Sequence, residues 1–341
     1  MVNPGQKNVL MEIFMRKILL ASTALVAVAG VSAASADGHI SLSGGTDVSY
    51  TTVSDDQTDN AATGQNGNSM ASDTDLKAAW STTTDSGLAI AVNYDIDADS
   101  GDASITGDWG TFSFDDGNEA MGVGGGDADS VSNMGIVGDN TILYSGGESI
   151  GGGMIAYSNS IGGISFGVGM GNGGQASAAD ETSYGVSYSS SVNGADVSVS
   201  YAAASTGAAT DLVSATDLNA SSMTVGVSIG AVSIDMAQNA EKATRNDDNS
   251  SGTGFKDVKS TNMGVTYAVT DSLTLEAASV AAEGTFTSNT DYKYDESAYG
   301  IAYTVASGVT LTASYSDFTQ SGGGGTDVSG SGTTVKLAIS F

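Results

Sequence analysis

Carboxylates are the side chains with which this sequence could do chemistry. The chain of 341 residues carries 39 Asp and Glu against 10 Lys and Arg, which gives a formal net charge of −29. Cysteine is absent and His39 is the single histidine, so thiolate metal sites and Ser-His or Cys-His catalysis lack their essential groups. The carboxylates lie mainly in polar segments, where the sequence does not distinguish a catalytic acid or base from a solvated surface residue. We therefore expect no enzymatic activity, and no nucleic-acid partner, because the chain would repel phosphate.

One acidic run has the spacing of a calcium-binding loop. Four carboxylates follow one another at short intervals in it, at Asp95, Asp97, Asp99 and Asp102. Such oxygen ligands suit Ca²⁺, although the distal bidentate Glu of an EF-hand is missing. The alternative interpretation is a solvated acidic loop between two strands. The sequence thus indicates calcium as a candidate ligand and no required cofactor.

A second acidic segment, residues 115–153, is much longer than a connection needs. It is rich in glycine and contains no Lys or Arg. A stretch of this length without regular structure is uncommon inside a compact domain and is usually functional. It is not a phosphate-binding loop, because the GxxxxGK[ST] motif is absent. Its carboxylates are Asp115, Asp116, Glu119, Asp127, Asp129, Asp139 and Glu148.

In the segments that must position these carboxylates, apolar and polar residues alternate with a period of two. In residues 40–52, for example, Ile40, Leu42 and Val48 share one parity and serines the other, as in a two-faced strand. Tight turns with Gly, Asn or Asp alternate with long polar loops such as 53–72. About sixteen strands are predicted in this way, at 40–52, 76–82, 88–94, 103–108, 111–114, 154–158, 164–170, 184–190, 197–203, 223–229, 232–236, 263–269, 273–281, 299–305, 309–315 and 333–341.

This layout predicts an all-β fold, a transmembrane antiparallel β-barrel of about sixteen strands in which residues 115–153 form the third long loop. Short turns at one rim and long loops at the other are typical of outer-membrane barrels, and closure leaves no unpaired edge in lipid. A soluble β-sandwich or solenoid is the alternative, because its strands also alternate. Aromatic residues near the strand ends are candidates for the interface girdles: Tyr50, Trp80, Tyr94, Trp109, Tyr188, Tyr201, Tyr267, Tyr303 and Tyr315.

The N-terminus has the pattern of a secretory signal peptide at residues 15–36. Arg16 and Lys17 precede an apolar run at 18–30, which ends in the small residues Ala34, Ser35 and Ala36. The run is too short to span a membrane as a helix. Residues 1–14 have no place in the pattern and are interpreted as an upstream or non-native extension. The barrel domain would then comprise residues 37–341.

Three segments carry a family resemblance. Residues 83–88 (TTDSGL) resemble a second-strand hairpin, and residues 107–112 (GDWGTF) with Asp115 and Asp116 resemble the segment that leads into a pore loop. The C-terminal segment 335–341 (VKLAISF) has apolar residues at alternate positions and ends in Phe341. On these residues the chain resembles a general porin of the Gram-negative outer membrane, nearest to the alphaproteobacterial branch.

The resemblance implies an outer-membrane homotrimer, each barrel with its own channel for small hydrophilic solutes. It further implies that the third long loop, 115–153, folds into the barrel, so that its seven carboxylates line the constriction. Phe341 would be part of the assembly signal read by the barrel-insertion machinery. Outer-membrane lipid and lipopolysaccharide would be the surrounding partners, with divalent cations bridging to the acidic loops.

The sequence departs from the family in its lumen charges. Porin constrictions usually oppose these carboxylates with arginines, whereas residues 78–241 contain no Lys or Arg. By strand parity, the lumen wall carries Lys77 and Lys336 together with the acids Asp47, Asp235 and Glu276. Because acidic side chains in a pore favour cations, the sequence predicts a cation-preferring channel. The alternative function, an acidic calcium-dependent secreted surface or adhesion protein, would need tandem repeats, and we find none.

Overall fold

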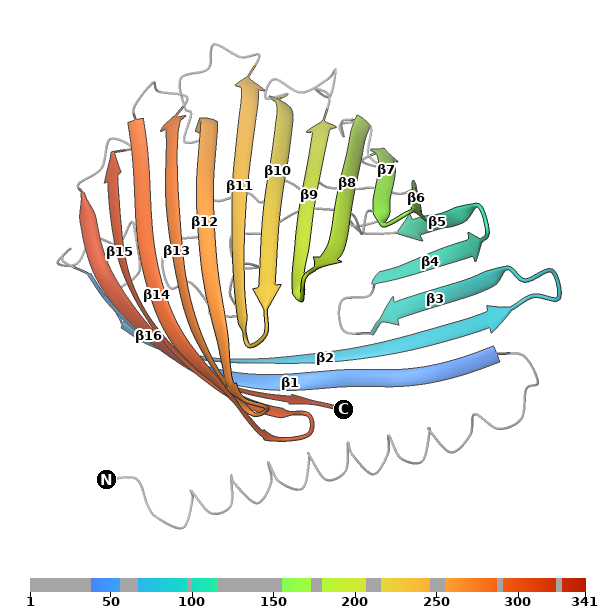
Figure 1. The fold of residues 1–341 in the computed structure, drawn as a ribbon. Coiled ribbons are helices and arrows are strands. Elements are labelled where there is room, and N and C mark those ends of the chain that lie inside the picture. Colours follow the sequence, from blue (N-terminus) through green and yellow to red (C-terminus); the bar gives the residue numbers. More distant parts are fainter. Residues whose placement is uncertain are drawn as a thin grey trace.

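Sixteen antiparallel strands close into a barrel in the computed structural model, because the first strand pairs with the last (Figure 1). The structure describes residues 38–55, 67–96, 100–115, 155–172, 180–206, 216–245, 255–286, 291–322 and 327–341. The strands are β1 (Gly38–Asp55), β2 (Gly67–Thr83), β3 (Ala89–Asp95), β4 (Ser100–Gly107), β5 (Gly110–Asp115), β6 (Ile155–Ile161), β7 (Ile164–Asn172), β8 (Asp180–Val192), β9 (Ala195–Thr206), β10 (Thr216–Ile229), β11 (Val232–Arg245), β12 (Phe255–Thr270), β13 (Leu273–Phe286), β14 (Asp291–Ala306), β15 (Val309–Gly322) and β16 (Val328–Ser340). The predicted fold class is confirmed.

The tight turns lie where the sequence predicts them. Asn193 and Gly194 connect β8 to β9 with φ values of 53° and 83°, the positive values that a two-residue hairpin needs. β10 ends at Ile229 and β11 begins at Val232, which matches the predicted turn between them. The strand ends at this rim were predictable because the apolar alternation stops there and turn residues follow it.

At the opposite rim several predicted boundaries are wrong. Both ends of the predicted polar loop 53–72 are strand, because β1 continues to Asp55 and β2 begins at Gly67. β14 likewise begins at Asp291, eight residues before the predicted start at Tyr299. Apart from Met70, these extensions carry polar side chains on the outer side, so the alternation of apolar residues ends while the hydrogen-bonded ladder continues. A strand that rises above the hydrocarbon layer no longer needs apolar outer side chains.

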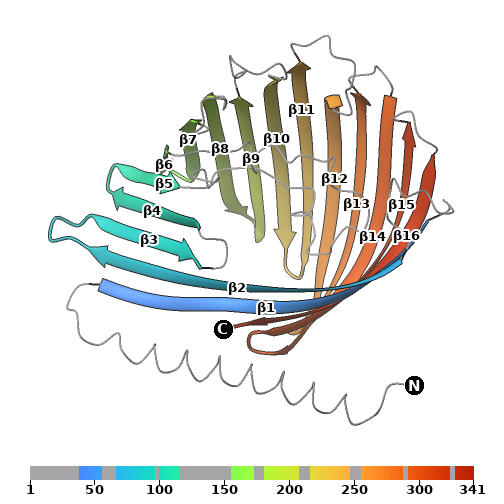
Figure 2. The same cartoon turned by 180° about the vertical axis from the view of Figure 1, so that it is seen from behind.

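The barrel wall has two heights. Strands β3 to β6 have 7, 8, 6 and 7 residues, whereas β12 and β14 have 16 each. Figures 1 and 2 show β3, β4 and β5 as short arrows and β8 to β15 as long strands standing side by side. At about 3.4 Å per residue, the short strands reach only about 24 Å, close to the height of an apolar band. The low wall thus consists mainly of the membrane-spanning part.

Closure brings the two ends of the ordered barrel together. Phe341 and Gly44 exchange two backbone hydrogen bonds, with N–O distances of 3.1 and 2.9 Å, and the C-terminus lies beside β1 in Figure 1. The predicted signal peptide at residues 15–36 lies outside the described residues. Among the described residues, no helix is long and apolar enough to cross a membrane.

Candidate functional site: the inner face of the barrel

Side-chain alternation gives the barrel an outer and an inner face. The nine aromatic residues predicted for the girdles are all exposed, from 38% (Trp80 and Tyr201) to 47% (Tyr188). On the opposite face of the sheet lies a cluster of buried side chains. That cluster combines Val258, Val280, Ala282, Tyr292, Tyr294, Phe318 and Val328, with Val53 packed against it. Side chains that meet from six neighbouring strands of a curved sheet do so on its concave side. The cluster therefore identifies the inner face.

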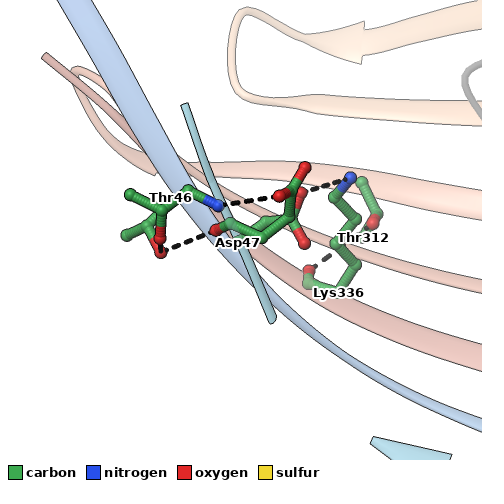
Figure 3. A network of polar contacts seen from close by, with 6 residues as sticks. Thr46, Asp47, Thr312 and Lys336 are labelled. Carbon is green, nitrogen blue, oxygen red and sulfur yellow. Dashed lines mark hydrogen bonds and ion pairs between the residues drawn. The ribbon is translucent and has the colours of Figure 1, made fainter. Parts of the chain in front are cut away.

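The two described inner-face lysines each lie beside a carboxylate. Lys336 Nζ on β16 is 2.8 Å from Asp47 Oδ2 on β1, across the closing seam of the barrel (Figure 3). Lys77 Nζ on β2 is 3.5 Å from Asp95 Oδ2 on β3. Both pairs are partly exposed to solvent, so each stabilises the fold only slightly. Each pair also cancels one positive charge of the inner face.

Further carboxylates lie on the same face without a lysine opposite. Asp196 and Asp235 border an inner cavity of about 400 Å³ together with serines of β8, β9 and β10. Gly226 allows this arrangement: a Cβ there would be 2.6 Å from both Asp235 Oδ1 and Ser198 Oγ. The glycine thus makes room for the Asp235 carboxylate and the Ser198 hydroxyl, which come from the two strands that flank β10. The site can attract a hydrated cation and offer it oxygen ligands.

Buried acids continue this face toward the inner cluster. Glu296 is 3% exposed, and its Oε2 accepts a hydrogen bond of 2.5 Å from Tyr294 Oη. Glu276 on β13 is 7% exposed. A buried carboxylate is costly unless it is hydrogen-bonded, and the hydroxyl of Tyr294 supplies one such bond to Glu296.

Hydroxyl groups cover much of the remaining inner wall. Ser228 and Ser233 lie 2.8 Å apart through their Oγ atoms, and Thr51 and Thr334 lie 3.0 Å apart through Oγ1. Small side chains of this kind bond to each other across strands and still present lone pairs to water. The described inner wall is therefore wettable.

The structure brings together only part of the predicted site. Asp47, Lys77, Asp235, Glu276 and Lys336 all lie on the inner face. Asp115 is the last residue of β5 and pairs with Asp102 of β4. The other predicted constriction residues, Asp116, Glu119, Asp127, Asp129, Asp139 and Glu148, lie outside the described residues.

The predicted calcium ligands have other partners where they are described. Asp95 pairs with Lys77, and Asp102 Oδ1 accepts a hydrogen bond of 2.8 Å from Asn93 Nδ2. Asp97 and Asp99 lie outside the described residues. Within the described ranges, no three Asp, Glu, His or Cys side chains gather in a way that could hold a metal ion.

Sequence reasoning missed the inner aromatic cluster and two carboxylates, Asp196 and Glu296. Tyr292, Tyr294 and Glu296 fall in a segment that the sequence assigned to a loop. Their own alternation with Lys293 and Asp295 was a usable signal, since it is the period of a strand with a buried face.

The comparisons with known proteins agree with this geometry. The family described as Gram-negative porin matches residues 21–323. OmpT of Vibrio cholerae superposes with a TM-score of 0.63 at 14% identity, covering 90% of this chain and 99% of that one. The anion-selective porin from Comamonas acidovorans gives 0.59 at 14% identity, with 89% and 100% covered. Salmonella typhi OmpF, in a complex with daunomycin, gives 0.57 at 12% identity, with 89% and 97% covered.

No curated protein sequence matches the chain significantly. The structural likenesses, all at low identity, establish the barrel fold, and the family match extends over most of the sequence. The chain therefore belongs to the Gram-negative porins and is an outer-membrane protein.

Proposed function

We propose that the barrel is a water-filled channel for the passive diffusion of small hydrophilic solutes and ions, and that it prefers cations. The observation that carries the proposal is the charge of the inner face. Its two described lysines, Lys77 and Lys336, each lie beside a carboxylate, whereas Asp196 and Asp235 border a cavity without a lysine. The described inner wall is thus negative in sum.

A few uncompensated carboxylates are enough for a measurable preference. One carboxylate about 4 Å from a passing cation contributes about 1 kcal/mol even at the dielectric constant of water. That energy raises the local cation concentration about fivefold and lowers the anion concentration by a similar factor. The effect weakens with ionic strength, because the Debye length shrinks from about 30 Å at 0.01 M to about 3 Å at 1 M.

The fold itself does not set the sign of selectivity. The porin from Comamonas acidovorans shares the barrel and is anion-selective. The charges on the inner face must therefore decide, and in this chain they are acidic. The closed barrel offers no support for the alternative of a secreted calcium-dependent adhesion protein. The family and its fold are typical of proteins without enzymatic activity.

The proposal is tested with Asp196→Asn combined with Asp235→Asn in planar bilayers. Both side chains border the inner cavity, so the double variant should show a reversal potential in a KCl gradient that is shifted toward zero. Asp317→Asn on the outer face of β15 is the matched control and should leave the potential unchanged. If the double variant were as selective as the parent, Asp196 and Asp235 would not contribute to the ion preference.

We further propose the arrangement that the family resemblance implies. Residues 115–153 would form the inward constriction loop, and Phe341 would take part in the assembly signal. A homotrimer would meet through the low wall, whose outer face carries Val92, Phe112 and Phe114, each about 40% exposed. The assignment to the alphaproteobacterial branch remains a prediction from the three resembling segments.

Calcium remains a proposal for Asp95, Asp97, Asp99 and Asp102, supported by their spacing in the sequence. Its test is the thermal melting of the assembled protein with Ca²⁺ and with a chelator. Calcium binding to the folded protein should raise the melting temperature, and identical curves would contradict it.

A further inference from the structure

The inner cavity bordered by Asp196 and Asp235 lies across four neighbouring strands, β8 to β11, which stand side by side in Figure 1. Two adjacent rows of opposed residues cross it. One row consists of Ser189, Ser198, Gly226 and Asp235, and the next of Ser191, Asp196, Ser228 and Ser233. Its volume of about 400 Å³ is at the low end of the range for small-molecule sites, which suits a solute of the size of a monosaccharide.

Two acceptor atoms converge over Gly226. A Cβ at this position would lie 2.6 Å from Asp235 Oδ1 and 2.6 Å from Ser198 Oγ. Asp235 reaches this point from β11 and Ser198 from β9, so the two oxygen atoms are at most twice that distance apart. One nitrogen atom that donates hydrogen bonds of about 2.8 Å can therefore contact both oxygen atoms.

These acceptors are available to a ligand. Within the described part of the chain, neither the Asp235 nor the Ser198 side chain has a hydrogen-bonding or ion-pair partner. Asp196, in the next row, accepts a hydrogen bond from Ser191 Oγ. None of the described residues that border the cavity is a lysine or an arginine. The cavity therefore carries two negative charges and is complementary to a cationic solute.

The arrangement suits an organic ammonium group better than a metal ion. In the described ranges, no three Asp, Glu, His or Cys side chains gather in a way that could hold a metal ion. A primary ammonium group needs only hydrogen-bond acceptors and offers three donors. Ser189 and Ser228 border the same cavity and present further hydroxyl groups to a ligand. A solute that combines an ammonium group with hydroxyl groups matches both parts of this wall.

We propose that the cavity binds small solutes that carry a primary ammonium group together with hydroxyl groups, such as amino sugars. The ammonium group donates hydrogen bonds to Asp235 Oδ1 and Ser198 Oγ, and the hydroxyl groups contact the serines of the cavity. The proposal rests on the proposed channel function and adds a preferred class of solute to it. Binding at such a site must be weak, because a solute that crosses a channel has to leave as well as enter.

The test is the interruption of ion current through single channels of the folded full chain in planar bilayers, with glucosamine as the probe. Two solutes serve as comparisons: glucose lacks the ammonium group, and choline has a positive charge and a hydroxyl group but no N–H donor. Glucosamine should bind about tenfold more tightly than either, because each comparison solute lacks the charge-assisted hydrogen bonds to Asp235.

Gly226→Ala is the sharpest variant, because it fills the space between the two acceptors without changing a charge. Its Cβ would displace Asp235 Oδ1 and Ser198 Oγ, which are the ends of side chains, so the barrel should still fold. Glucosamine binding should weaken about tenfold. Ser198→Ala removes one acceptor and should weaken it about fivefold, which keeps the inference testable if Gly226→Ala does not fold.

Gly169→Ala is the matched control. It adds the same methyl group to the inner face of β7, 2.7 Å from Ser183 Oγ, and Gly169 does not border the cavity. This variant should bind glucosamine as the parent does. An equal loss in Gly169→Ala, or unchanged glucosamine binding in both Gly226→Ala and Ser198→Ala, would overturn the inference.

The reversal potential of the unmodified protein in a KCl gradient, measured in the same bilayers, separates this inference from the proposed ion preference. A channel that prefers K⁺ but binds glucose or choline as tightly as glucosamine would overturn the inference alone. Tighter binding of glucosamine in a channel without K⁺ preference would support the inference and contradict only the proposed ion preference.

Discussion

Gly110 begins the short strand β5, which leads into the longest connection of the chain. β5 pairs with β6 through only four residue pairs, although 39 residues, 116–154, connect the two strands. Tyr157 Oη and Asn159 Nδ2 both donate hydrogen bonds to the Trp109 carbonyl oxygen, at 2.5 and 2.9 Å. These contacts clamp the turn to β6. We predict that Gly110→Ala releases this clamp.

The expected magnitude follows from the geometry. Gly110 has a φ of +117°, which costs an L-residue about 1–3 kcal/mol. An alanine Cβ would lie 2.5 Å from the Ser158 carbonyl oxygen and 2.9 Å from Tyr157 Oη, so backbone or ring must move. Loss of the Tyr157 hydrogen bond adds about 1 kcal/mol. The free energy of unfolding should fall by about 3–5 kcal/mol in total.

Urea unfolding of the detergent-folded barrel, followed by tryptophan fluorescence and gel mobility, measures this loss. Gly194→Ala is the matched control, because Gly194 also has a positive φ, +83°, but no atom lies within 4 Å of its Cβ position. The control should lose only about 1–2 kcal/mol, the cost of left-handed backbone. Equal losses in the two variants would refute the clamp, since backbone conformation alone would then explain both.

Three further predictions test other parts of the barrel. Lys336→Gln breaks the 2.8 Å ion pair with Asp47. Because the pair is partly exposed, the free energy of unfolding should change by less than about 1 kcal/mol, whereas the reversal potential should indicate a stronger cation preference. An unchanged reversal potential would contradict a lumen position for Lys336. Tyr294→Phe should destabilise the barrel by about 1–3 kcal/mol in urea, because buried Glu296 loses a donor, and full stability would contradict that role. Deletion of Phe341 should lower the yield of folded barrel on heat-modifiability gels, because two hydrogen bonds to β1 are lost, and normal assembly would count against the assembly signal.

The part of the fold that the sequence predicted is the part that the lipid constrains. Between Met263 and Val269, for example, outer positions must be apolar and the strand must end in a turn, so period and turn chemistry coincide. Beyond the hydrocarbon layer, as at residues 291–298, both strand faces carry polar groups or tyrosines. No apolar signal on the outer face marks these strands, which are defined by their hydrogen bonds to neighbours and by the weaker alternation of buried and exposed side chains.

For the candidate site, the sequence predicted only which side chains face inward, because their odd or even position along a strand determines this. Lys336 and Asp235 could be assigned to the inner face from their own strands, because each lies between two outward apolar residues. That Lys336 lies beside Asp47 could not be predicted, because the pair crosses the closing seam and depends on the register of β1 against β16. The approach of Asp235 and Ser198 to Gly226 from its two sides likewise requires the register of three strands.

The reversal potential of the unmodified protein shows whether the acidic inner face makes this porin prefer cations. Purified protein is inserted into a planar bilayer between two KCl solutions of different concentration at low ionic strength, where screening is weak. We expect a potential whose sign shows that K⁺ permeates more readily than Cl⁻. A potential of zero, or of the sign that indicates Cl⁻ preference, would contradict it.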